Sequence, residues 1–472
     1  MSLVNKVLKI YNKIPLGILN CVAPFYHLLP MKLRYGKVFC DTYDYLMNFD
    51  HKDESACRKM EADSFIAVVK SAYENVPYYR RSFQEHNIDL KNFKGIEEIS
   101  RLPLLTKGLI RKNLDDMIGG GQCKDRLLYV TTSGSTGQPL VFYQSPDITM
   151  KEWAYTNYLW SRVGYKPNSS RLVLRGKVFR NQREKGADWQ WDAFKRELSC
   201  NIFNMTRENL ELYCRKIEKY RPEYIHGYMS AITVLCKYIE KRGIKHDFRG
   251  VLATSETVMQ EQREYVESIL HTRVFSFYGH SERLVIAAEC EYSTEYHVEP
   301  CYGVAEIVDR DGNTITEPGI EGELVATGFL NFDMPLIRYK TGDIAEWSND
   351  SIECACGRKH KRIMRVAGRW NQDVLVNKGN AIVSLTAINM HSDVFKNIVK
   401  YQFFQEEVGK VKLKIVVADG FTQNDKTEIE RQIYEKLGDS VDFAVEEVQD
   451  IPVNTNGKYK IVDQKLDLSI FQ

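Results

Sequence analysis

The pattern of hydrophobic and polar residues divides the chain into regions that predict different secondary structure. Between about residues 53 and 110, hydrophobic residues recur every three or four positions, as in "ESACRKMEADSFIAVVKSAYENV", which predicts helices. From "RLLYVTTSG" to "RVFSFYG", short apolar runs typical of buried strands alternate with amphipathic segments such as "RENLELYCRKIEKY". This alternation predicts an α/β domain whose sheet contains parallel strands. Ligands in such folds bind at loops that follow strands, which is where "TTSGSTG" and "FYGHSE" fall.

The pattern changes twice in the second half of the chain. After Cys301, "GVAEIVDRDGNTI" and "EGELVATGF" alternate like antiparallel strands joined by turns. Beyond about Gly368, a hairpin pattern, the helical "KTEIERQIYEKLG" and the strand-like "VDFAVEEVQDI" predict a compact α+β unit of about 100 residues. We therefore expect a helical arm at 1–50, a core domain at 51–368 and a small domain at 369–472.

The N-terminal arm has the spacing of a basic amphipathic helix. Lys6, Lys9 and Lys13 are interleaved with apolar residues at helical intervals. The favoured interpretation is a helix packed on its own domain, and the alternative is attachment to a membrane surface through residues 1–35. No apolar run approaches the roughly 18–20 residues of a membrane span, and no small-residue cleavage site of a signal peptide follows. We expect a cytoplasmic protein, with peripheral contact at the inner face of the membrane as the alternative.

Charge and cysteine content narrow the class of protein. The 472 residues include 65 Lys and Arg against 63 Asp and Glu, so the net charge is +2. This balance gives no electrostatic argument for nucleic-acid binding. The eleven cysteines are scattered, which argues against a secreted disulfide scaffold and favours free thiols in a reducing compartment or a metal site.

The stretch "TTSGSTG" has the properties of a phosphate-binding loop. Gly134 and Gly137 allow the backbone to approach an anion closely, and successive free N–H groups form an anion-binding concavity. The serine and threonine hydroxyls add further donors. The loop lacks the lysine that ends the Walker pattern, and alone it is more often a plain turn than a nucleotide site.

Three later segments favour the nucleotide interpretation. In "FSFYGHSERL", the Tyr278 ring could stack on a base and the Glu282 carboxylate could hold Mg²⁺. In "MPLIRYKTGDIAEW", Asp343 could accept hydrogen bonds from both ribose hydroxyls. In "IPVNTNGKYKIV", a glycine-containing turn presents Lys458. Each segment alone is a weak signal, and their combination is a strong one.

In this order, "TSGSTGQP", "YGHSE", "RYKTGD", "GR" and "NTNGK" resemble the motifs of the adenylate-forming superfamily. The resemblance spans roughly residues 102–458 and is closest to the phenylacetate–CoA ligase branch and the CapK-like proteins of capsular polysaccharide synthesis. It implies an α/β fold: a large N-terminal domain of mixed sheets with helices and an antiparallel β subdomain, and a small mobile α+β C-terminal domain. The small domain would rotate about a hinge after the Gly-Arg pair, for which Asp373 is favoured.

The resemblance also implies a reaction. A carboxylic acid would attack the α-phosphate of ATP to give acyl-AMP and pyrophosphate, and a thiol or an amine would then take the acyl group and release AMP. The acceptor would be CoA, a carrier protein or an amino sugar, and the acid itself cannot be read from the sequence. An alternative is a catalytically inactive or membrane-surface scaffold in envelope polysaccharide assembly. The joint presence of Glu282, Asp343 and Lys458 argues against an inactive protein.

The same resemblance assigns roles to residues. Lys458 would bridge the attacking carboxylate and the α-phosphate, Glu282 would hold Mg²⁺, and Ser281 would bond the α-phosphate. His226 and Tyr228 match a wall of the pocket, although a satisfied buried histidine is the favoured role for His226. The nucleotide-contacting residues that it implies are Thr132, Ser133, Gly134, Ser135, Thr136, Gly137, Ser255, Glu256, Tyr278, Gly279, Asp343, Arg338 and Arg369. One departure is Gln138-Pro139-Leu140, where the family often has a lysine after the proline, and it weakens any claim about ATP affinity.

Two cysteine-rich segments form a candidate metal site. "ECEYSTEYHVEPC" and "ECACGRKH" together supply a C-x-C pair, further cysteines and two histidines, a donor set that suits tetrahedral zinc. The two interpretations, a structural zinc site and free thiols, stand at even odds. The expected ligands are Cys290, His297, Cys354 and Cys356, with Cys301 and His360 in reserve.

Overall fold

The computed structural model describes residues 14–121, 124–131, 140–176, 188–349, 351–367, 374–384, 388, 397–418, 420–451 and 461–471. Several predicted site residues lie outside these ranges. They are the phosphate-loop residues Thr132 to Gly137, together with Arg369, the hinge candidate Asp373, and Lys458. The predicted domain boundary near 368–373 also falls there, between a strand that ends at Ala367 and one that begins at Val374.

The first part of the described chain is helical, which confirms the prediction for residues 53–110. Asp53 begins the long helix α5 by accepting a hydrogen bond from the Ala56 backbone N–H at 2.8 Å. Pro77 then ends the run and starts the next helix, where its missing N–H costs nothing. The helices are α2 (Leu16–Leu28), α3 (Met31–Tyr35), α4 (Lys37–Phe49), α5 (Glu54–Asn75), α6 (Pro77–Glu85) and α7 (Lys107–Lys112).

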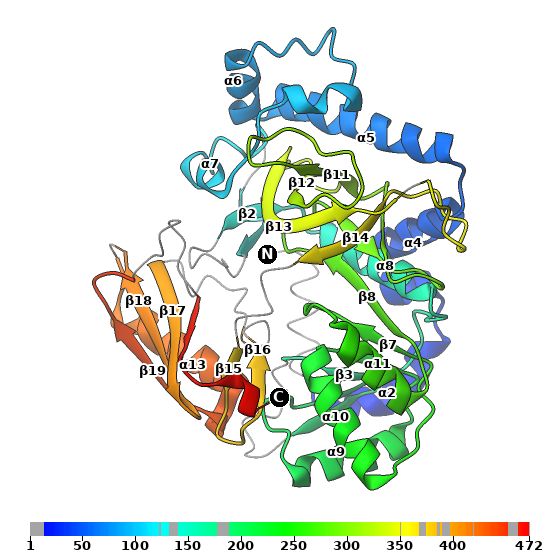
Figure 1. Cartoon of the computed structure of the whole chain (residues 1–472), viewed down its shortest axis with the longest axis vertical. Helices are drawn as coiled ribbons and strands as arrows, with labels where there is room; N and C mark the ends of the chain where they lie inside the picture. Colours follow the sequence, from blue (N-terminus) through cyan, green and yellow to red (C-terminus); the bar gives the residue numbers. More distant parts are fainter. Residues whose placement is uncertain are drawn as a thin grey trace.

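A twelve-stranded mixed sheet forms the centre of the molecule (Figure 1). Its parallel part runs β5-β3-β6-β7-β8, and strands such as β6 and β7 are buried along their whole length, as expected where helices cover both faces. The strands are β3 (Arg171–Leu174), β5 (Glu197–Cys200), β6 (Tyr224–Gly227), β7 (Gly250–Ala253) and β8 (Val274–Gly279). The accompanying helices are α8 (Ile148–Ser161), α9 (Arg207–Tyr220), α10 (Met229–Arg242) and α11 (Gln260–Leu270). The predicted α/β domain with parallel strands is confirmed.

The other strands of this sheet are antiparallel, which confirms the prediction for the chain after Cys301; β4, β9 and β10 precede Cys301 and were not predicted. They continue from β8 in the order β9-β10-β14-β13-β12-β11, and β4 closes the opposite edge. Their bounds are β4 (Trp189–Asp192), β9 (Ile286–Ala288), β10 (Tyr296–Val298), β11 (Gly303–Val308), β12 (Gly322–Gly328), β13 (Tyr339–Trp347) and β14 (Arg362–Ala367). Strands β9 and β10 therefore join the parallel region to the antiparallel one. The turn between β8 and β9 carries "YGHSE", and Cys290 and His297 lie just after β9 and in β10.

One predicted strand lies apart from the large sheet. β1 (Leu128–Thr131) pairs only with β2 (Val141–Gln144), in an antiparallel hairpin whose last pair is Thr131 with Val141. The rhythm of the sequence had placed the serine- and glycine-rich stretch after a buried strand of the α/β unit. In this hairpin, β2 alternates between half-buried and buried positions, whereas β1 is half-buried or exposed until Thr131, so one face of the hairpin is open to solvent.

The C-terminal unit is a four-stranded sheet with one long helix, as predicted. The buried side chains of β18, Val411, Leu413 and Ile415, alternate along the strand and share a core with Ile429 and Ile433 of α13. The sheet order is β19-β18-β17-β20. The elements are β17 (Ile398–Glu407), β18 (Lys410–Val417), α13 (Gln423–Leu437), β19 (Asp442–Glu447) and β20 (Val462–Gln464), preceded by the hairpin of β15 (Val374–Val376) and β16 (Ile382–Ser384).

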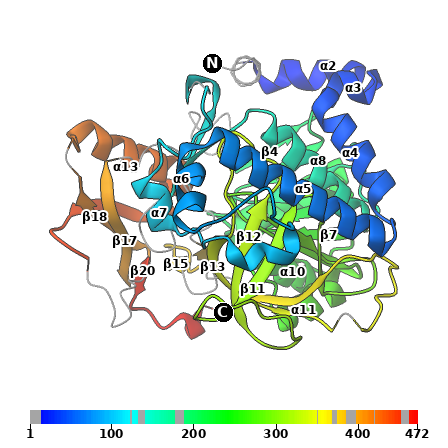
Figure 2. The same ribbon diagram turned by 90° about the horizontal axis from the view of Figure 1, so that it is seen from above.

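The C-terminal unit packs on the parallel region of the core. The Asn377 side-chain amide donates to the Phe203 carbonyl oxygen at 2.8 Å, and Leu375 belongs to the same buried cluster as Leu235 of α10. Figure 2 shows this unit on one side of the molecule and helices α2, α3 and α4 on the opposite side. Short 3₁₀ turns complete the described elements: η1 (Ile96–Arg101), η2 (Lys124–Arg126), η5 (Gly438–Ser440) and η6 (Leu468–Ile470).

Candidate active site and metal centre

Two motifs that are far apart in the sequence meet at the end of β8. Tyr278 and Gly279 pair with β9, so "YGHSE" is the turn that connects the two strands. The Tyr278 hydroxyl donates to Asp343 Oδ2 at 2.7 Å, and the Tyr339 hydroxyl donates to Glu282 Oε1 at 2.8 Å. The partners are 65 and 57 positions apart, and both bonds join the turn to β13. Two carboxylates are thus fixed by phenolic hydroxyls at the same end of the sheet.

Glu282 is an ionised carboxylate held in a largely buried place. Its side chain is 8% exposed, and His280 Nδ1 lies 3.3 Å from its Oε2 atom. Burial by itself raises the pKa of Glu282, but the interactions with His280, the charge of Lys107 and the Tyr339 hydroxyl outweigh it and lower the pKa to about 2. A carboxylate that stays charged at neutral pH with polar neighbours on one side is a suitable ligand for a hard divalent cation.

The lowered pKa of Glu282 makes a prediction about acid stability. A carboxyl group whose pKa is depressed in the folded state stabilises the fold above its ordinary pKa of 4.5, and that contribution is lost as the pH falls toward 2. Between pH 6 and pH 3, we expect wild type to lose about 2 kcal/mol more unfolding free energy than Glu282→Gln. Urea unfolding at the two pH values measures this difference, and Glu74→Gln, at an exposed helical position, serves as the control. Equal acid sensitivity of wild type and Glu282→Gln would contradict the assignment.

Tyr278 keeps its proton because of the same surroundings. Burial raises the pKa of Tyr278 well above its ordinary value, and the charge of Asp343 raises it further. The hydroxyl therefore remains a donor to Asp343 at all physiological pH values. This bond fixes the position of both side chains relative to the turn.

Ser255 and Glu256 follow the carboxyl end of β7, beside the end of β6. Thr254 N–H donates to the Gly227 carbonyl oxygen at 3.1 Å, which holds the two strand ends together. Glu256 accepts hydrogen bonds from both the N–H and the hydroxyl of Ser230, each at 2.9 Å, in the first turn of α10. An acidic side chain at this end of a helix is electrostatically favourable. Glu256 therefore has a structural partner, and its contact with a nucleotide remains a prediction.

Arg338 is also held by the protein. It is 2% exposed, and its Nε and Nη2 atoms donate to the two carboxylate oxygens of Glu306 at 3.0 and 2.8 Å. Its Nη1 atom donates to the carbonyl oxygens of Ser100 and Leu102 at 3.0 and 2.7 Å. This bidentate pair anchors the start of β13 to the helical region and to β11. In this arrangement the guanidinium of Arg338 bonds only to protein groups among the described residues. Its contact with ribose or phosphate stays a prediction.

His226 is buried, as the favoured interpretation expected, and its contact with an acid stays a prediction. Its ring lies edge-on to Trp160 with the centroids 4.7 Å apart. Burial, together with the charges of Arg175 and Arg171, lowers the pKa of His226 well below its ordinary value. The imidazole is therefore neutral and forms part of the packed wall at the end of β6.

The predicted phosphate loop is located by the strands on either side of it. Gln144 of β2 accepts a hydrogen bond from Arg283 Nη1 at 3.3 Å, and Arg283 directly follows Glu282 in the turn after β8. The hairpin that carries the loop therefore adjoins the turn that carries Ser281, Glu282 and the exposed Gly279. Thr132 to Gly137 themselves lie outside the described residues.

The structure adds three residues that the sequence did not single out. Tyr339 and His280 contact Glu282 directly, and Lys107 contributes to its electrostatics. Tyr339 and His280 stand inside the motifs "RYKTGD" and "YGHSE", so their place in the site had a signal. Lys107 had none, because it lies at the start of α7, far from either motif in the sequence.

A second site lies where β9, β10 and the loop before β14 meet. The ligand atoms of Cys290, His297, Cys354 and Cys356 all lie within 4.8 Å of one another. The Cys290 and Cys354 sulfurs are 3.5 Å apart, and Cys356 Sγ is 3.7 Å from His297 Nε2. Tetrahedral zinc with its usual bond lengths separates sulfur and nitrogen ligands by about 3.5–3.8 Å. The donor set and the spacing therefore fit zinc.

The local electrostatics of this cluster also suit a cation. Backbone N–H groups of Tyr292 and Ser293 donate to Cys290 Sγ at 3.4 and 3.2 Å. Hydrogen bonds from Cys290 and His297 lower the pKa of the Cys356 thiol, whereas the contact with Cys356 and burial raise the pKa of the Cys290 thiol, so the pair favours a thiolate at Cys356. The reserve ligands lie outside the cluster: Cys301 Sγ is 4.0 Å from the Tyr45 hydroxyl, and His360 Nδ1 is 3.6 Å from Glu299 Oε1.

The loop that carries two of the cysteines is bound to the rest of the core by Arg358. Its guanidinium donates twice to Asp50 at the end of α4, both at 2.7 Å, and twice to Glu291, at 2.6 and 2.9 Å. Burial opposes ionisation of Asp50, but the hydrogen bond and charge of Arg358, with the charge of Arg162, lower the pKa of Asp50 to about 2. The cluster and this buried ion-pair network therefore hold the same loop.

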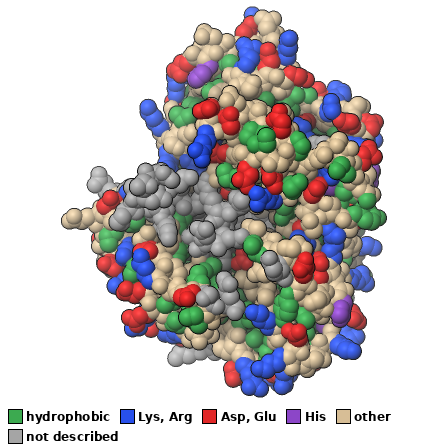
Figure 3. Space-filling model, in the orientation of Figure 1, with side chains coloured by type: hydrophobic (Ala, Val, Ile, Leu, Met, Phe, Trp, Pro, Cys, Tyr) green, Lys and Arg blue, Asp and Glu red, His purple; other side chains and the backbone are tan. Residues whose placement is uncertain are grey.

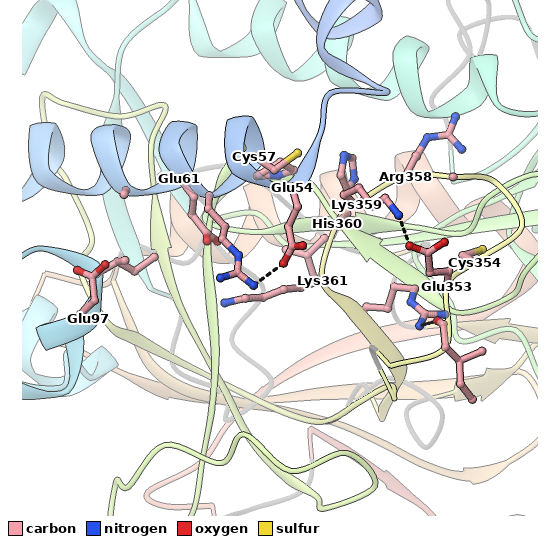
Figure 4. Close-up of a pocket in the computed structure, with 18 residues that line it drawn as sticks. Glu54, Cys57, Glu61, Glu97, Glu353, Cys354, Arg358, Lys359, His360 and Lys361 are labelled. Atoms are coloured by element: carbon pink, nitrogen blue, oxygen red, sulfur yellow. Dashed lines mark hydrogen bonds and ion pairs between the residues drawn. The ribbon is translucent and has the colours of Figure 1, made fainter.

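A cavity of about 550 Å³ opens beside the cluster, between α5 and this loop (Figure 4). Four of the charged residues that line it form two ion pairs: Glu54 contacts Arg58, and Glu353 contacts Lys359. Cys354 is half-buried and lines the same cavity. The cavity is therefore a solvent-accessible route to one thiol of the cluster, on a different part of the molecule from Glu282 and Asp343.

The chain is similar to known proteins in sequence and in fold. Residues 374–465 match the family described as the CapK C-terminal domain. Protein CapK of Staphylococcus aureus is 27% identical over 458 residues, covering 95% of this chain and 97% of the relative. The phenylacetate-coenzyme A ligase of Thermus thermophilus is 25% identical over 374 residues, covering 77% of this chain and 82% of the relative.

Among solved structures, the fold matches that of 2-hydroxyisobutyryl-CoA ligase crystallised with 2-HIB-AMP and CoA in the thioesterification state. The TM-score is 0.57 at 16% identity, and the match covers 93% of this chain and 94% of that chain. At this identity the match shows a shared fold and nothing more.

Within the described part of the chain, every helix is too short or too polar to cross a membrane.

Proposed function

We propose that this chain, which belongs to the CapK and phenylacetate–coenzyme A ligase-like family of adenylate-forming ligases, activates a carboxylic acid with ATP. The acid would attack the α-phosphate to give acyl-AMP and pyrophosphate, and an acceptor would then displace AMP. The supporting observation is the pair of hydrogen bonds that joins Tyr278 to Asp343 and Tyr339 to Glu282. They bring the base-stacking, ribose-binding and metal-binding candidates of the family to one end of the sheet.

Within this proposal each side chain has one task. Asp343 accepts the ribose hydroxyls, the Tyr278 ring packs on adenine, and Ser281 bonds the α-phosphate. Glu282 is the ligand for Mg²⁺, which neutralises phosphate charge when it is bound. The phosphate-loop residues with Gly279 and Arg369 would hold the phosphates, and Lys458 would hold the attacking carboxylate against the α-phosphate. Ser255, Glu256 and Arg338 would line or support the pocket.

The acceptor in the second half-reaction is proposed to be the thiol of CoA. Support comes from the Thermus relative, whose name is a coenzyme A ligase, and from the ligase with the matching fold, whose crystals hold an acyl-adenylate and CoA. The longer match to Protein CapK favours a role in capsule or cell-surface polysaccharide synthesis, where an amine of an amino sugar would be the acceptor. The two acceptors are distinguished by the experiment that tests the function.

That experiment measures pyrophosphate release with ATP and Mg²⁺ across a panel of aryl, short-chain, amino and sugar acids. We expect at least one acid to stimulate release, and either CoA or an amino sugar to raise turnover and AMP formation. Tyr339→Phe removes only the hydroxyl that donates to Glu282. This variant should release less pyrophosphate than wild type and should still fold. The absence of stimulation by every acid, in a folded preparation, would contradict the proposal.

The ribose assignment has its own test. Asp343→Ala should raise the KM for ATP by about 10–100-fold and leave the KM for the acid nearly unchanged, because a hydrogen bond to a charged group is worth about 1.5–3 kcal/mol. Tyr278→Phe, which keeps the ring and removes the donor to Asp343, should raise the KM for ATP less than Asp343→Ala does. A change confined to the KM for the acid would assign Asp343 to the acid pocket instead.

We also propose that the second site holds a structural zinc ion, with Cys290, His297, Cys354 and Cys356 as ligands. The three sulfurs and one imidazole nitrogen supply all four positions of a tetrahedral site, which leaves none for a substrate. The ion would therefore support the fold and would take no part in the reaction.

A further inference from the structure

Helices α2 and α3 expose an unusual number of large apolar side chains. Phe25 is 72% exposed, Leu28 82% and Leu33 71%, and Ile18, two turns before Phe25 on α2, is 56% exposed. The exposed residues Ile18, Val22, Phe25 and Leu29 follow the spacing of one helical face. Single exposed apolar residues are ordinary, but a continuous apolar face marks an interaction surface. Figure 2 shows both helices at the outer edge of the molecule.

The opposite face of α2 is already fixed to the core, so the apolar face cannot turn inward. Leu19 and Ala23 are buried, and the Asn20 side-chain oxygen accepts from the Ala193 N–H at 2.9 Å. His27 Nε2 donates to the Ala193 carbonyl oxygen at 2.8 Å. One face of α2 is thus held against the core by buried apolar contacts and hydrogen bonds, and the other, apolar face is left exposed.

The charge of this region is unlike that of the rest of the chain. No Asp or Glu precedes Asp41, whereas the first forty residues contain six Lys and Arg: Lys6, Lys9, Lys13, Lys32, Arg34 and Lys37. Because the whole chain has a net charge of +2, the remaining residues carry a net charge of −4. On the face drawn in Figure 3, acidic and basic side chains are interspersed. Lys32 and Lys37 are exposed on α3 and at the start of α4, close in sequence to Leu33, and Lys37 also forms an exposed ion pair with Asp41.

We propose that α2 and α3 dock this protein on an anionic lipid surface. Phe25, Leu28 and Leu33 enter the boundary between head groups and acyl chains, and Lys32 and Lys37 face the lipid phosphates, the arrangement of interfacial amphipathic helices. A second copy of the chain is the less suitable partner, because a symmetric contact would place the same basic, acid-free segment against itself. The proposal is independent of the acid-ligase function.

The test is co-sedimentation of the full chain with lipid vesicles at low ionic strength. Vesicles of roughly three parts phosphatidylcholine to one part phosphatidylglycerol should bind the protein at least about tenfold better than phosphatidylcholine alone. The triple variant Phe25→Ser, Leu28→Ser, Leu33→Ser should lose at least about tenfold in binding to the anionic vesicles. Lys32→Glu with Lys37→Glu should weaken binding and reduce its dependence on salt.

The matched control is Ile352→Ser with Ile470→Ser, two exposed apolar residues outside this face that are 64% and 75% exposed. This control should bind as wild type does, and thermal melting should show that all variants fold. Equal vesicle binding by wild type and the triple variant would overturn the proposal. So would a wild-type protein that ignores the vesicles, or one that self-associates through these residues by sedimentation velocity, since the face would then join two copies.

Discussion

Replacing Lys458 with alanine is expected to lower acid-dependent pyrophosphate release by at least about a thousandfold. The reaction brings a carboxylate against a phosphate, so two negative groups must approach each other, and a positioned ammonium offsets their repulsion. Glu282 cannot do this, because it is itself ionised, with a pKa of about 2. In the proposed mechanism, the lysine of "NTNGK" is the cation that contacts both the attacking carboxylate and the α-phosphate. The measurement is pyrophosphate release with the most active acid of the panel.

Two controls make the Lys458 test specific. Lys460→Ala changes a second lysine of the same segment, which leads into β20, and should retain most of the activity. Lys458→Ala should also keep wild-type melting behaviour and should still pass the acyl group from a supplied acyl-adenylate to the acceptor, because that half-reaction does not use the α-phosphate contact. Near-normal pyrophosphate release by Lys458→Ala would remove this residue from the mechanism.

Much of the fold could be predicted from periodicity alone. Strands such as β6 and β7 are short, fully buried and separated by amphipathic helices, a pattern that few arrangements other than a parallel sheet produce. The C-terminal unit could be predicted equally well. The buried residues of β18 alternate strictly, and a glycine, Gly409, stands at the hairpin turn, where it adopts a positive φ of 73°.

The strands that escaped prediction lack these signals. β4 and β5 form a hairpin through residues 193–196, which contain no glycine, asparagine or proline. Arg196 adopts a φ of 51° there, and Asp192 supports the turn by accepting from the Lys195 N–H at 3.2 Å. Such turns depend on local side-chain bonds and on tertiary packing, and no composition rule identifies them.

The sequence predicted which segments form the candidate site, but it did not predict which side chains contact one another there. The sequence order of the motifs pointed to a common site, and the structure places Tyr278 beside Asp343. Whether a charged residue in a motif faces a ligand or the protein is decided by its distant neighbours. Arg338 is matched by Glu306, and Glu256 by Ser230, and neither partner belongs to a recognisable motif.

The proposed zinc site and the Arg358 network lie on the same loop. Cys354 and Cys356 belong to the proposed site, and Arg358, two residues after Cys356, binds Asp50 and Glu291. Breaking a buried ion pair is costly because an uncompensated charge is left in the interior. Loss of a bound metal would free the loop and thereby weaken this network, so the effect should reach Asp50 at the end of α4.

Removal of the metal is therefore expected to destabilise the protein by about 3–5 kcal/mol. Protein purified without a histidine tag should contain about one zinc per chain by elemental analysis, and a chelator that enters beside Cys354 should lower the melting temperature. Cys356→Ser should abolish zinc binding and produce the same loss, whereas Cys301→Ser, outside the cluster, should change neither. A zinc content near zero would refute the metal assignment. An unaltered melting temperature in zinc-free Cys356→Ser would instead show that Arg358 holds the loop without help, because only the ion-pair network would then remain to fix it.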